Sequence, residues 1–286
     1  MSVMVTKTHY TATDGYALSG RHYQGQNPQA KLVIASATGV PQGFYKQFAE
    51  YAANAGFDVF TFDYRGIGES KPSNLKGFDM DYRDWAQKDL QAVLEVIHDP
   101  SLPLYLVGHS YGGHAVGMLD NHSLISAACF FGAGAGWHGW MPKMEGLRVQ
   151  FMWNVIAPVI TRMKGYLGWS ALGMGEDLPM GVYRQWKRWC KHPNYFFDDP
   201  DYQEMHQMFS TVELPIKAVT ATDDKWALPQ SRDAFIKHYV NSDLDLIDVH
   251  PSTIGAKHIG HMGYFRPHAA KLWPQALEFF MQQGQG

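Results

Sequence analysis

The chain has 286 residues, of which 45% are hydrophobic, and its 24 basic and 27 acidic side chains give a net charge of −3. This composition is too apolar for a disordered chain and too weakly charged for nucleic-acid binding through bulk positive charge. Two cysteines, Cys129 and Cys190, cannot build a disulfide framework, which favours a reducing compartment. The N-terminus has no basic region followed by an apolar run, and the longest apolar stretch, residues 155–160, is far shorter than the roughly 20 residues of a membrane span. We therefore expect a globular, cytoplasmic protein.

Short β-branched or aromatic runs alternate with amphipathic stretches, a pattern typical of an α/β protein with a mostly parallel sheet flanked by helices. The chain begins with two strand-like runs, 6–11 and 17–23, and the turn Asp14-Gly15 between them predicts a hairpin. The pattern then predicts strands over 31–37, 58–64, 103–108 and 125–131, with helices over 44–53, 85–98 and 111–119. It resumes with strands over 216–220 and 244–249, a helix over 230–239 and a C-terminal helix.

The alternation stops between residues 135 and 214, so we expect a core of residues 1–134 and 215–286 interrupted by a helical cap of residues 135–214. This insertion holds six of the nine tryptophans and eight of the fourteen methionines: Trp137, Trp140, Trp153, Trp169, Trp186, Trp189, Met141, Met144, Met152, Met163, Met174, Met180, Met205 and Met208. Most of them are expected to pack the cap onto the core, and some to line an apolar substrate cleft.

The same insertion carries a run of apolar residues, 151–160, flanked by Arg148, Arg162 and Lys164. A basic and apolar pattern of this kind is compatible with a membrane surface. A buried cap helix explains the pattern as well, so membrane binding is not expected.

The strongest chemical signal lies at Gly108-His109-Ser110-Tyr111-Gly112, between a predicted strand and a predicted helix. A nucleophile on such a sharp turn adopts strained backbone angles, and the glycines two residues before and after it leave room for the turn. The free N–H groups of the following helix favour negative charge, so the N–H of Tyr111 is the expected first oxyanion donor. His109 and His114 are expected to flank the turn and to lie within the first helical turn, respectively, without transferring protons.

With this turn the chain resembles the α/β-hydrolase superfamily of serine hydrolases. Asp63-Tyr64-Arg65-Gly66-Ile67-Gly68-Glu69-Ser70 is similar to a strand-end turn of that superfamily, in which Asp63 and Arg65 are expected to bond locally and play a structural part. The loop Thr38-Gly39-Val40-Pro41-Gln42 is similar to the loop that supplies the second oxyanion donor, so the resemblance assigns that donor to Val40, with Gly39 as the alternative. Together with Trp186–Cys190 and His258–Arg266, this loop is also similar to a bacterial group of hydrolases of unassigned substrate.

A serine hydroxyl needs a general base and an acid that orients the base. The resemblance implies the chain order nucleophile, acid, histidine. It assigns the base to His261 in Gly260-His261-Met262-Gly263, with His258 as the alternative, and the acid to Asp224, with Asp223 as the alternative. The pair His258 and His261 has no third ligand at a suitable spacing, so neither a metal nor another cofactor is expected.

The resemblance therefore predicts a hydrolase of carboxylic esters or thioesters that works through a Ser-His-Asp acyl-enzyme on a small-molecule substrate with an apolar part. Two alternatives remain: an acyltransferase with the same triad, and a non-catalytic protein that binds a ligand in the cap cleft. The sequence predicts neither the acyl and alcohol groups of the substrate nor the oligomeric state.

Overall fold

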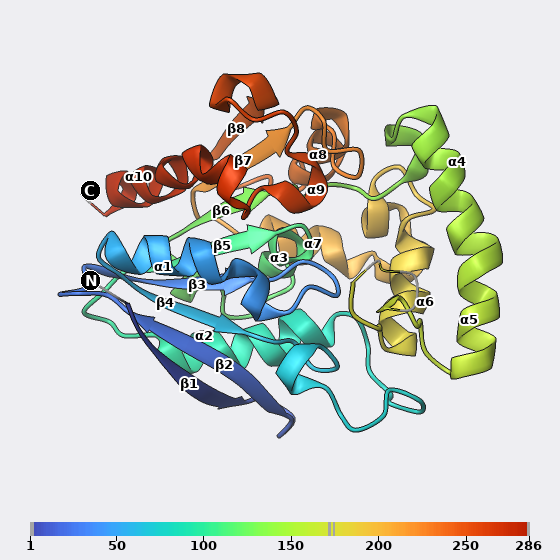
Figure 1. Ribbon diagram of the computed structural model, residues 1–286, viewed down its shortest axis with the longest axis horizontal. Coiled ribbons are helices and arrows are strands. Elements are labelled where there is room, and N and C mark those ends of the chain that lie inside the picture. The colour runs from blue at the N-terminus through green and yellow to red at the C-terminus, as the bar shows by residue number, and fades with distance from the viewer. Residues whose placement is uncertain (1–2, 171–172, 174, 285–286) are drawn as a thin grey trace.

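Eight strands form one sheet in the computed structural model, which describes residues 3–170, 173 and 175–284 (Figure 1). The strands are Met4–Thr11 (β1), Ala17–Gln24 (β2), Ala30–Ala35 (β3), Phe57–Phe62 (β4), Leu104–His109 (β5), Ala127–Phe131 (β6), Ile216–Ala221 (β7) and Leu244–Val249 (β8). Their spatial order is β1-β2-β4-β3-β5-β6-β7-β8. β2 is antiparallel to β1 and to β4, and every other pair is parallel. The expected hairpin and the mostly parallel sheet are thereby confirmed.

Helices cover both faces of this sheet. The α-helices are Lys46–Asn54 (α1), Gln91–Ile97 (α2), Tyr111–Val116 (α3), Lys143–Phe151 (α4), Ala157–Lys164 (α5), Met180–Trp189 (α6), Glu204–Ser210 (α7), Pro229–Ile236 (α8), Gly260–Gly263 (α9) and Trp273–Gln283 (α10). Two π-helical segments, Trp85–Leu90 and Met152–Ile156, continue directly into α2 and α5. The helices expected from the sequence are confirmed within a few residues; those predicted over 111–119 and 230–239 each end three residues early, at Val116 and Ile236.

The core is divided by the sheet into two layers, because successive side chains of a strand point to opposite faces. Leu104 and Leu106 of β5 join the layer beneath α2, α3 and α8, whereas Tyr105 and Val107 join the layer beneath α1 and α10. All six residues of β5 are buried, as expected for a central parallel strand.

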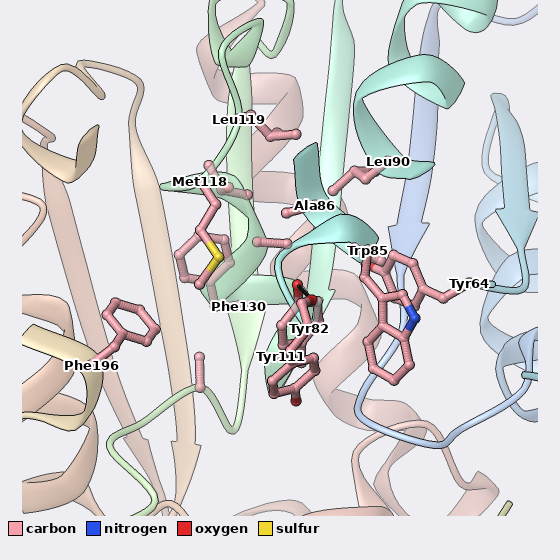
Figure 2. Close-up of a cluster of buried hydrophobic side chains, with 14 of the residues drawn as sticks. Tyr64, Tyr82, Trp85, Ala86, Leu90, Tyr111, Met118, Leu119, Phe130 and Phe196 are labelled. Atoms are coloured by element: carbon pink, nitrogen blue, oxygen red, sulfur yellow. Dashed lines mark hydrogen bonds between the residues drawn. The ribbon is translucent and has the colours of Figure 1, made fainter. Parts of the chain in front are cut away.

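An aromatic cluster fills the first layer next to the carboxyl end of β5 (Figure 2). Tyr64 stacks on Trp85 with ring centroids 5.0 Å apart, and Tyr82 stacks on Tyr111 at 4.5 Å. Tyr82 also stacks on Trp189 of α6 at 5.2 Å. Ring pairs of this kind add to the energy of burial, and here they tie the residue after Ser110 to the segment that follows β6.

The segment 135–214 contains α4 to α7. Its only strand-like feature among the described residues is a bridge between Leu167 and Leu178. In Figure 1, α4, α5 and α6 lie beyond the end of the sheet toward which β5 and β7 point. α7 lies next to α3 instead, and a Cβ atom on Gly117 would come within 2.4 Å of the Phe209 ring. Met174 lies outside the described residues.

Both cysteines are buried and free. In the described part of the chain, no helix is at once long and apolar enough to cross a bilayer.

Candidate active site

Ser110 occupies the turn between β5 and α3, with a φ of 51° and a ψ of −109°. Non-glycine residues rarely adopt a positive φ, and such strain persists where the surrounding structure enforces it. Here the Ser110 N–H donates to the carbonyl oxygen of Phe131 at 2.9 Å, which fastens the turn to the end of β6.

The two glycines of the motif leave room for this turn. A Cβ atom on Gly108 would lie 2.7 Å from the carbonyl carbon of Gly112. A Cβ atom on Gly112 would lie 2.1 Å from the carbonyl oxygen of Ala35 in β3. Neither distance is possible for a side chain. The packing of the turn between β5 and α3 therefore requires glycine at both positions of the Gly-x-Ser-x-Gly motif.

His261 faces Ser110 from the short helix α9, after the last strand. Its Nε2 lies 3.0 Å from the Ser110 Oγ, and its Nδ1 lies 2.9 Å and 3.1 Å from the two carboxylate oxygens of Asp224. The structure therefore brings together the three side chains named from the sequence, in the geometry by which a base accepts a serine proton while an acid orients the base.

Asp224 is fully buried and follows β7. Its carboxylate accepts hydrogen bonds from the Tyr264 hydroxyl at 2.9 Å and from the N–H groups of Trp226 and Ala227 at 3.0 and 3.1 Å, as well as from His261. Burial acts to raise the pKa of Asp224, but the charge of His261 and these hydrogen bonds outweigh it and hold the pKa below its usual value. The group is therefore kept as an anion beside His261.

The alternatives to these residues lie elsewhere. Asp223 accepts hydrogen bonds from the N–H groups of Ile259 and Gly260 at 2.9 and 3.1 Å, so it ties the loop before His261 to the end of β7. The ring of His258 stacks on that of His268 at 5.3 Å.

The N–H of Val40, the expected second oxyanion donor, already has an acceptor. The Val40 N–H donates to the carbonyl oxygen of Ala37 at 3.1 Å, so it is used inside its own turn. Thr38 lies beside the site: it lines a small cavity of about 30 Å³ together with Ser110 and His261. Its N–H makes no hydrogen bond to any residue that the structure describes. Gly39, the other candidate, has a φ of +69° and accepts at its carbonyl from Glu176.

Tyr111 begins α3, and the first N–H groups of a helix have no acceptor within the helix. Its N–H is therefore available next to Ser110, as the sequence predicts. Its hydroxyl donates to the carbonyl oxygen of Tyr82 at 2.8 Å, which fixes the residue in the aromatic cluster of Figure 2.

His109 and His114 are both buried, and burial lowers the pKa of each to about 3, so both are neutral at ordinary pH. His114 Nε2 lies 3.0 Å from the carbonyl oxygen of Gly134. His109 Nε2 lies 2.8 Å from the carbonyl oxygen of His261, and its Nδ1 lies 2.9 Å from the Tyr45 hydroxyl. Their hydrogen bonds are structural, in line with the expectation that neither transfers protons.

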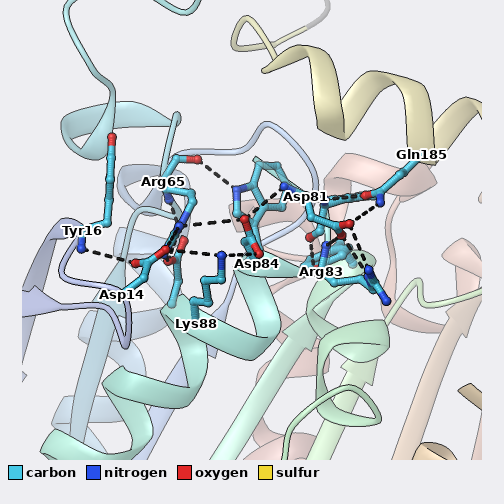
Figure 3. A network of polar contacts seen from close by, with 12 residues as sticks. Asp14, Tyr16, Arg65, Asp81, Arg83, Asp84, Lys88 and Gln185 are labelled. Carbon is cyan, nitrogen blue, oxygen red and sulfur yellow. Dashed lines mark hydrogen bonds and ion pairs between the residues drawn. The ribbon is translucent and has the colours of Figure 1, made fainter. Parts of the chain in front are cut away.

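The turn at Arg65 is held by ion pairs between distant parts of the chain (Figure 3). The guanidinium bonds both oxygens of Asp14 at 2.6 and 2.9 Å, and its Nε bonds the fully buried Asp89 at 2.7 Å. The expectation of local bonds is therefore wrong for Arg65. Asp63 accepts a local hydrogen bond from the N–H of Glu69 at 2.9 Å and a second one from the N–H of Gln42, 21 residues away, at 2.7 Å.

A cleft of about 490 Å³ opens over Ser110 and His261, a size typical of small-molecule sites. Its walls are mainly aromatic and apolar, with two arginines and no carboxylate among the described residues that line it: Val40, Phe44, Trp169, Trp186, Trp226, Met262, Arg148 and Arg266. The Arg266 guanidinium lies over the Phe44 ring at 4.3 Å. Two of the six insertion tryptophans thus reach the cleft, and the insertion's described methionines do not line it.

Sequence reasoning missed Thr38, Tyr264 and the partners of His109. Tyr264 follows His261 by three residues, so a side chain one helical turn away could have been considered. Tyr45 lies in the 3-10 turn before α1 and meets His109, at the end of β5, only in the folded chain, 64 residues apart in sequence, which leaves no local signal.

Comparisons with known proteins agree with this architecture. Residues 26–165, just under half of the chain, match a family model described as serine aminopeptidase, S33. A stretch of 107 residues is 29% identical to monoglyceride lipase of Homo sapiens, and a stretch of 92 residues is 33% identical to a monoglyceride lipase homologue of Schizosaccharomyces pombe. These matches cover 37% and 30% of this chain, but only 35% and 23% of the two relatives.

A solved structure gives a match over almost the whole chain. A soluble variant of monoglyceride lipase from Saccharomyces cerevisiae, in complex with a substrate analog, aligns with a TM-score of 0.69 over 99% of this chain and 96% of that chain, at 15% identity. The likeness is one of fold. Together, the sheet order, the strained serine turn and these matches show that the chain has the α/β-hydrolase fold.

Proposed function

We propose that this protein is a serine hydrolase that cleaves carboxylic esters with an apolar part, and that residues 135–214 act as the cap over its active site. The observation that carries the proposal is the continuous chain of contacts from Ser110 Oγ to His261 Nε2 at 3.0 Å and from His261 Nδ1 to Asp224 at 2.9 Å. The names of the relatives, monoglyceride lipases, support a monoglyceride-like ester as the substrate class.

In the first half-reaction, His261 Nε2 accepts the hydroxyl proton while Ser110 Oγ attacks the carbonyl carbon of the ester. The resulting oxyanion receives hydrogen bonds from the N–H of Tyr111 and, in place of Val40, from the N–H of Thr38. His261 then gives its proton to the departing alcohol oxygen, which leaves an acyl group on Ser110. Asp224 stays ionised and stabilises the charged imidazole.

In the second half-reaction, His261 removes a proton from water, and the oxygen attacks the acyl-enzyme carbonyl. The same two N–H groups hold the second oxyanion, and Ser110 leaves as its proton returns from His261. The products are a carboxylic acid, an alcohol and the free enzyme, so no cofactor enters the balance.

The cleft supports the substrate class. Trp169, Trp186 and Trp226 give it flat apolar walls beside Ser110. A pocket of this kind binds an acyl chain by burying apolar surface area rather than by specific polar contacts.

The test is a panel of p-nitrophenyl esters and acylglycerols of graded chain length, with amino-acid p-nitroanilides for the peptidase reaction named by the family model. We expect ester hydrolysis by the wild-type protein and a loss of at least about 10³-fold in Ser110→Ala. Cleavage of anilides but not esters would make the protein a peptidase. Transfer of the acyl group from Ser110 to an added alcohol instead of water would make it an acyltransferase. Hydrolysis that persists in Ser110→Ala, or no reaction on any substrate, would overturn the proposal.

A further inference from the structure

The outermost helix of the segment 135–214 is apolar on two faces. α4, the π-helical segment Met152–Ile156 and α5 follow one another without a break from Lys143 to Lys164 and form the outer edge of the molecule in Figure 1. One face is buried against the protein through Val149, Met152, Trp153 and Ala157, each at most 7% exposed. A helix that is apolar all round is expected to be covered on all sides.

The other face of this helix carries a stripe of exposed apolar side chains. The stripe consists of six residues that are 48–80% exposed: Met144, Leu147, Phe151, Val155, Val159 and Met163. They make up half of the twelve large apolar side chains with the greatest exposure in the described part of the chain. Isolated exposed apolar residues are ordinary, but a contiguous patch marks an interaction surface.

The spacing of the stripe is three residues and then four residues at each further step. An α-helix has 3.6 residues per turn, so repeated steps of four would slowly rotate away from one side. The π-helical segment in the middle has more residues per turn and offsets part of this drift. The expectation that a buried cap helix accounts for the run 151–160 is therefore wrong for this face.

Positive charge accompanies the stripe. Residues 143–164 contain four basic side chains and one carboxylate, a net charge of +3, whereas the whole chain carries −3 and the remaining residues therefore carry −6. Arg148 has a partner, Glu145, at 3.6 Å. Lys143, Arg162 and Lys164 have no ion pair with any described residue.

This distribution of charge distinguishes between two possible occupants. Lys143 lies near one end of the helix, with Arg148, which also lines the cleft, five residues further on, and Arg162 and Lys164 lie near the other end. A second copy, whether parallel or antiparallel, would bring a basic end against a basic end, which is unfavourable in a water-poor contact. An anionic lipid surface accepts both the apolar stripe and the cations at its edges.

We propose that the face formed by Met144, Leu147, Phe151, Val155, Val159 and Met163 lies on an anionic lipid surface, with the helix axis along the surface. The opposite face of the same helix packs behind the substrate cleft. Trp153 contacts Trp186 and Trp169, two cleft residues, with ring centroids 5.1 and 5.9 Å apart. Lipid contact would thus lie one helix away from the place where an apolar substrate enters.

The test is co-sedimentation of the purified protein with vesicles of phosphatidylcholine alone and of phosphatidylcholine with phosphatidylglycerol. The stripe variant is Phe151→Ser with Val159→Ser, and neither residue lines the cleft. The matched control is Val96→Ser with Val240→Ser, two exposed valines (each 64% exposed) outside this helix. A charge variant, Arg162→Gln with Lys164→Gln, tests the lipid charge.

We expect the wild-type protein and the control to bind the anionic vesicles alike, and the stripe and charge variants each to bind about tenfold or more weakly. Vesicles without phosphatidylglycerol should bind less protein, and high salt should weaken binding. Ser110→Ala should bind as the wild type does, so this result is independent of the proposed hydrolase function.

Unchanged thermal unfolding of the stripe variant, and unchanged hydrolysis of a short soluble ester if the protein is an esterase, would show that its fold is intact. Equal vesicle binding by wild type and stripe variant would overturn the proposal, as would no binding of the wild type to either vesicle. If the wild-type protein is a dimer that does not bind vesicles and the stripe variant is a monomer, the face would be assigned to contact with a second copy instead.

Discussion

The imidazole of His109 donates a hydrogen bond from Nε2 to the main-chain carbonyl oxygen of His261, at 2.8 Å. Because a carbonyl can only accept, Nδ1 of the neutral ring is the acceptor, and the Tyr45 hydroxyl donates to it at 2.9 Å. That hydroxyl accepts in turn from the N–H of Ala37 at 2.9 Å. One buried chain of hydrogen bonds therefore joins the loop of Thr38 to the backbone of the proposed general base.

Tyr45→Phe should break this chain while leaving every atom of the proposed triad in place. The Ala37 N–H and the His109 Nδ1 would lose their partner, so we expect kcat to fall about tenfold with little change in KM, and stability to fall by about 1–3 kcal/mol. Steady-state kinetics with a soluble ester and urea unfolding check both effects. Tyr51→Phe, in α1, which begins directly after Tyr45, is the control. A loss of stability without a loss of kcat would show that the chain only supports the fold.

Asp224→Asn and Asp223→Asn should differ sharply. The first substitution removes the anion that orients His261, and by analogy with other triads we expect kcat to fall about 10³–10⁴-fold. The second weakens two hydrogen bonds to the loop before His261 and should cost about tenfold or less. Both rates come from the same ester assay. A larger loss in Asp223→Asn than in Asp224→Asn would reverse the assignment of the acid.

The pKa of Asp224 also predicts how stability depends on pH. Burial raises this pKa, and the charge of His261 with hydrogen bonds from His261, Tyr264 and Trp226 lowers it further than burial raises it. The folded-state pKa of Asp224 lies below its unfolded value of about 3.9. The ionised carboxylate therefore stabilises the folded state above about pH 3.9, and this contribution is lost as the pH falls through the folded-state pKa.

Tyr264→Phe removes one of those hydrogen bonds, together with the partner of the Ala221 N–H. We therefore expect the acid midpoint of unfolding to move to a higher pH than in the wild type, and stability at pH 7 to fall by about 1–3 kcal/mol. Thermal unfolding between pH 3 and pH 7 measures both. An acid midpoint that stays in place would mean that Tyr264 does not stabilise the Asp224 anion.

Arg65→Met should destabilise the fold by about 3–5 kcal/mol, because it leaves the fully buried Asp89 without its cation. The control is Arg21→Met, whose partner Glu69 is 41% exposed, and it should cost less than about 1 kcal/mol. Urea unfolding of both variants gives the comparison. A similar small cost for both would contradict the structural role assigned to the Arg65 turn.

The elements and site residues that could be predicted from the sequence were those marked by a pattern of neighbouring residues. The alternation of strand and helix patterns predicted the sheet, and the steric needs of the Gly-x-Ser-x-Gly turn located Ser110. The resemblance supplied the chain order that pointed to Asp224 and His261.

What failed depended on tertiary structure. Which N–H of the loop 37–40 is free depends on a turn in which Val40 bonds to Ala37, and the sequence does not record that bond. The run 151–160 is apolar on both sides of its helix, so periodicity alone cannot tell which side faces the protein. The partners of Arg65 lie 51 and 24 residues away, beyond any local pattern.

The central claim is that His261 activates Ser110 as a nucleophile, and covalent labelling with an alkyl fluorophosphonate tests it directly by mass spectrometry. We expect one phosphonyl group per chain on the peptide that contains Ser110, no label in Ser110→Ala, and labelling of His261→Gln slowed about 10²–10⁴-fold. Labelling of a different residue, or equal labelling rates for the wild type and His261→Gln, would contradict the account.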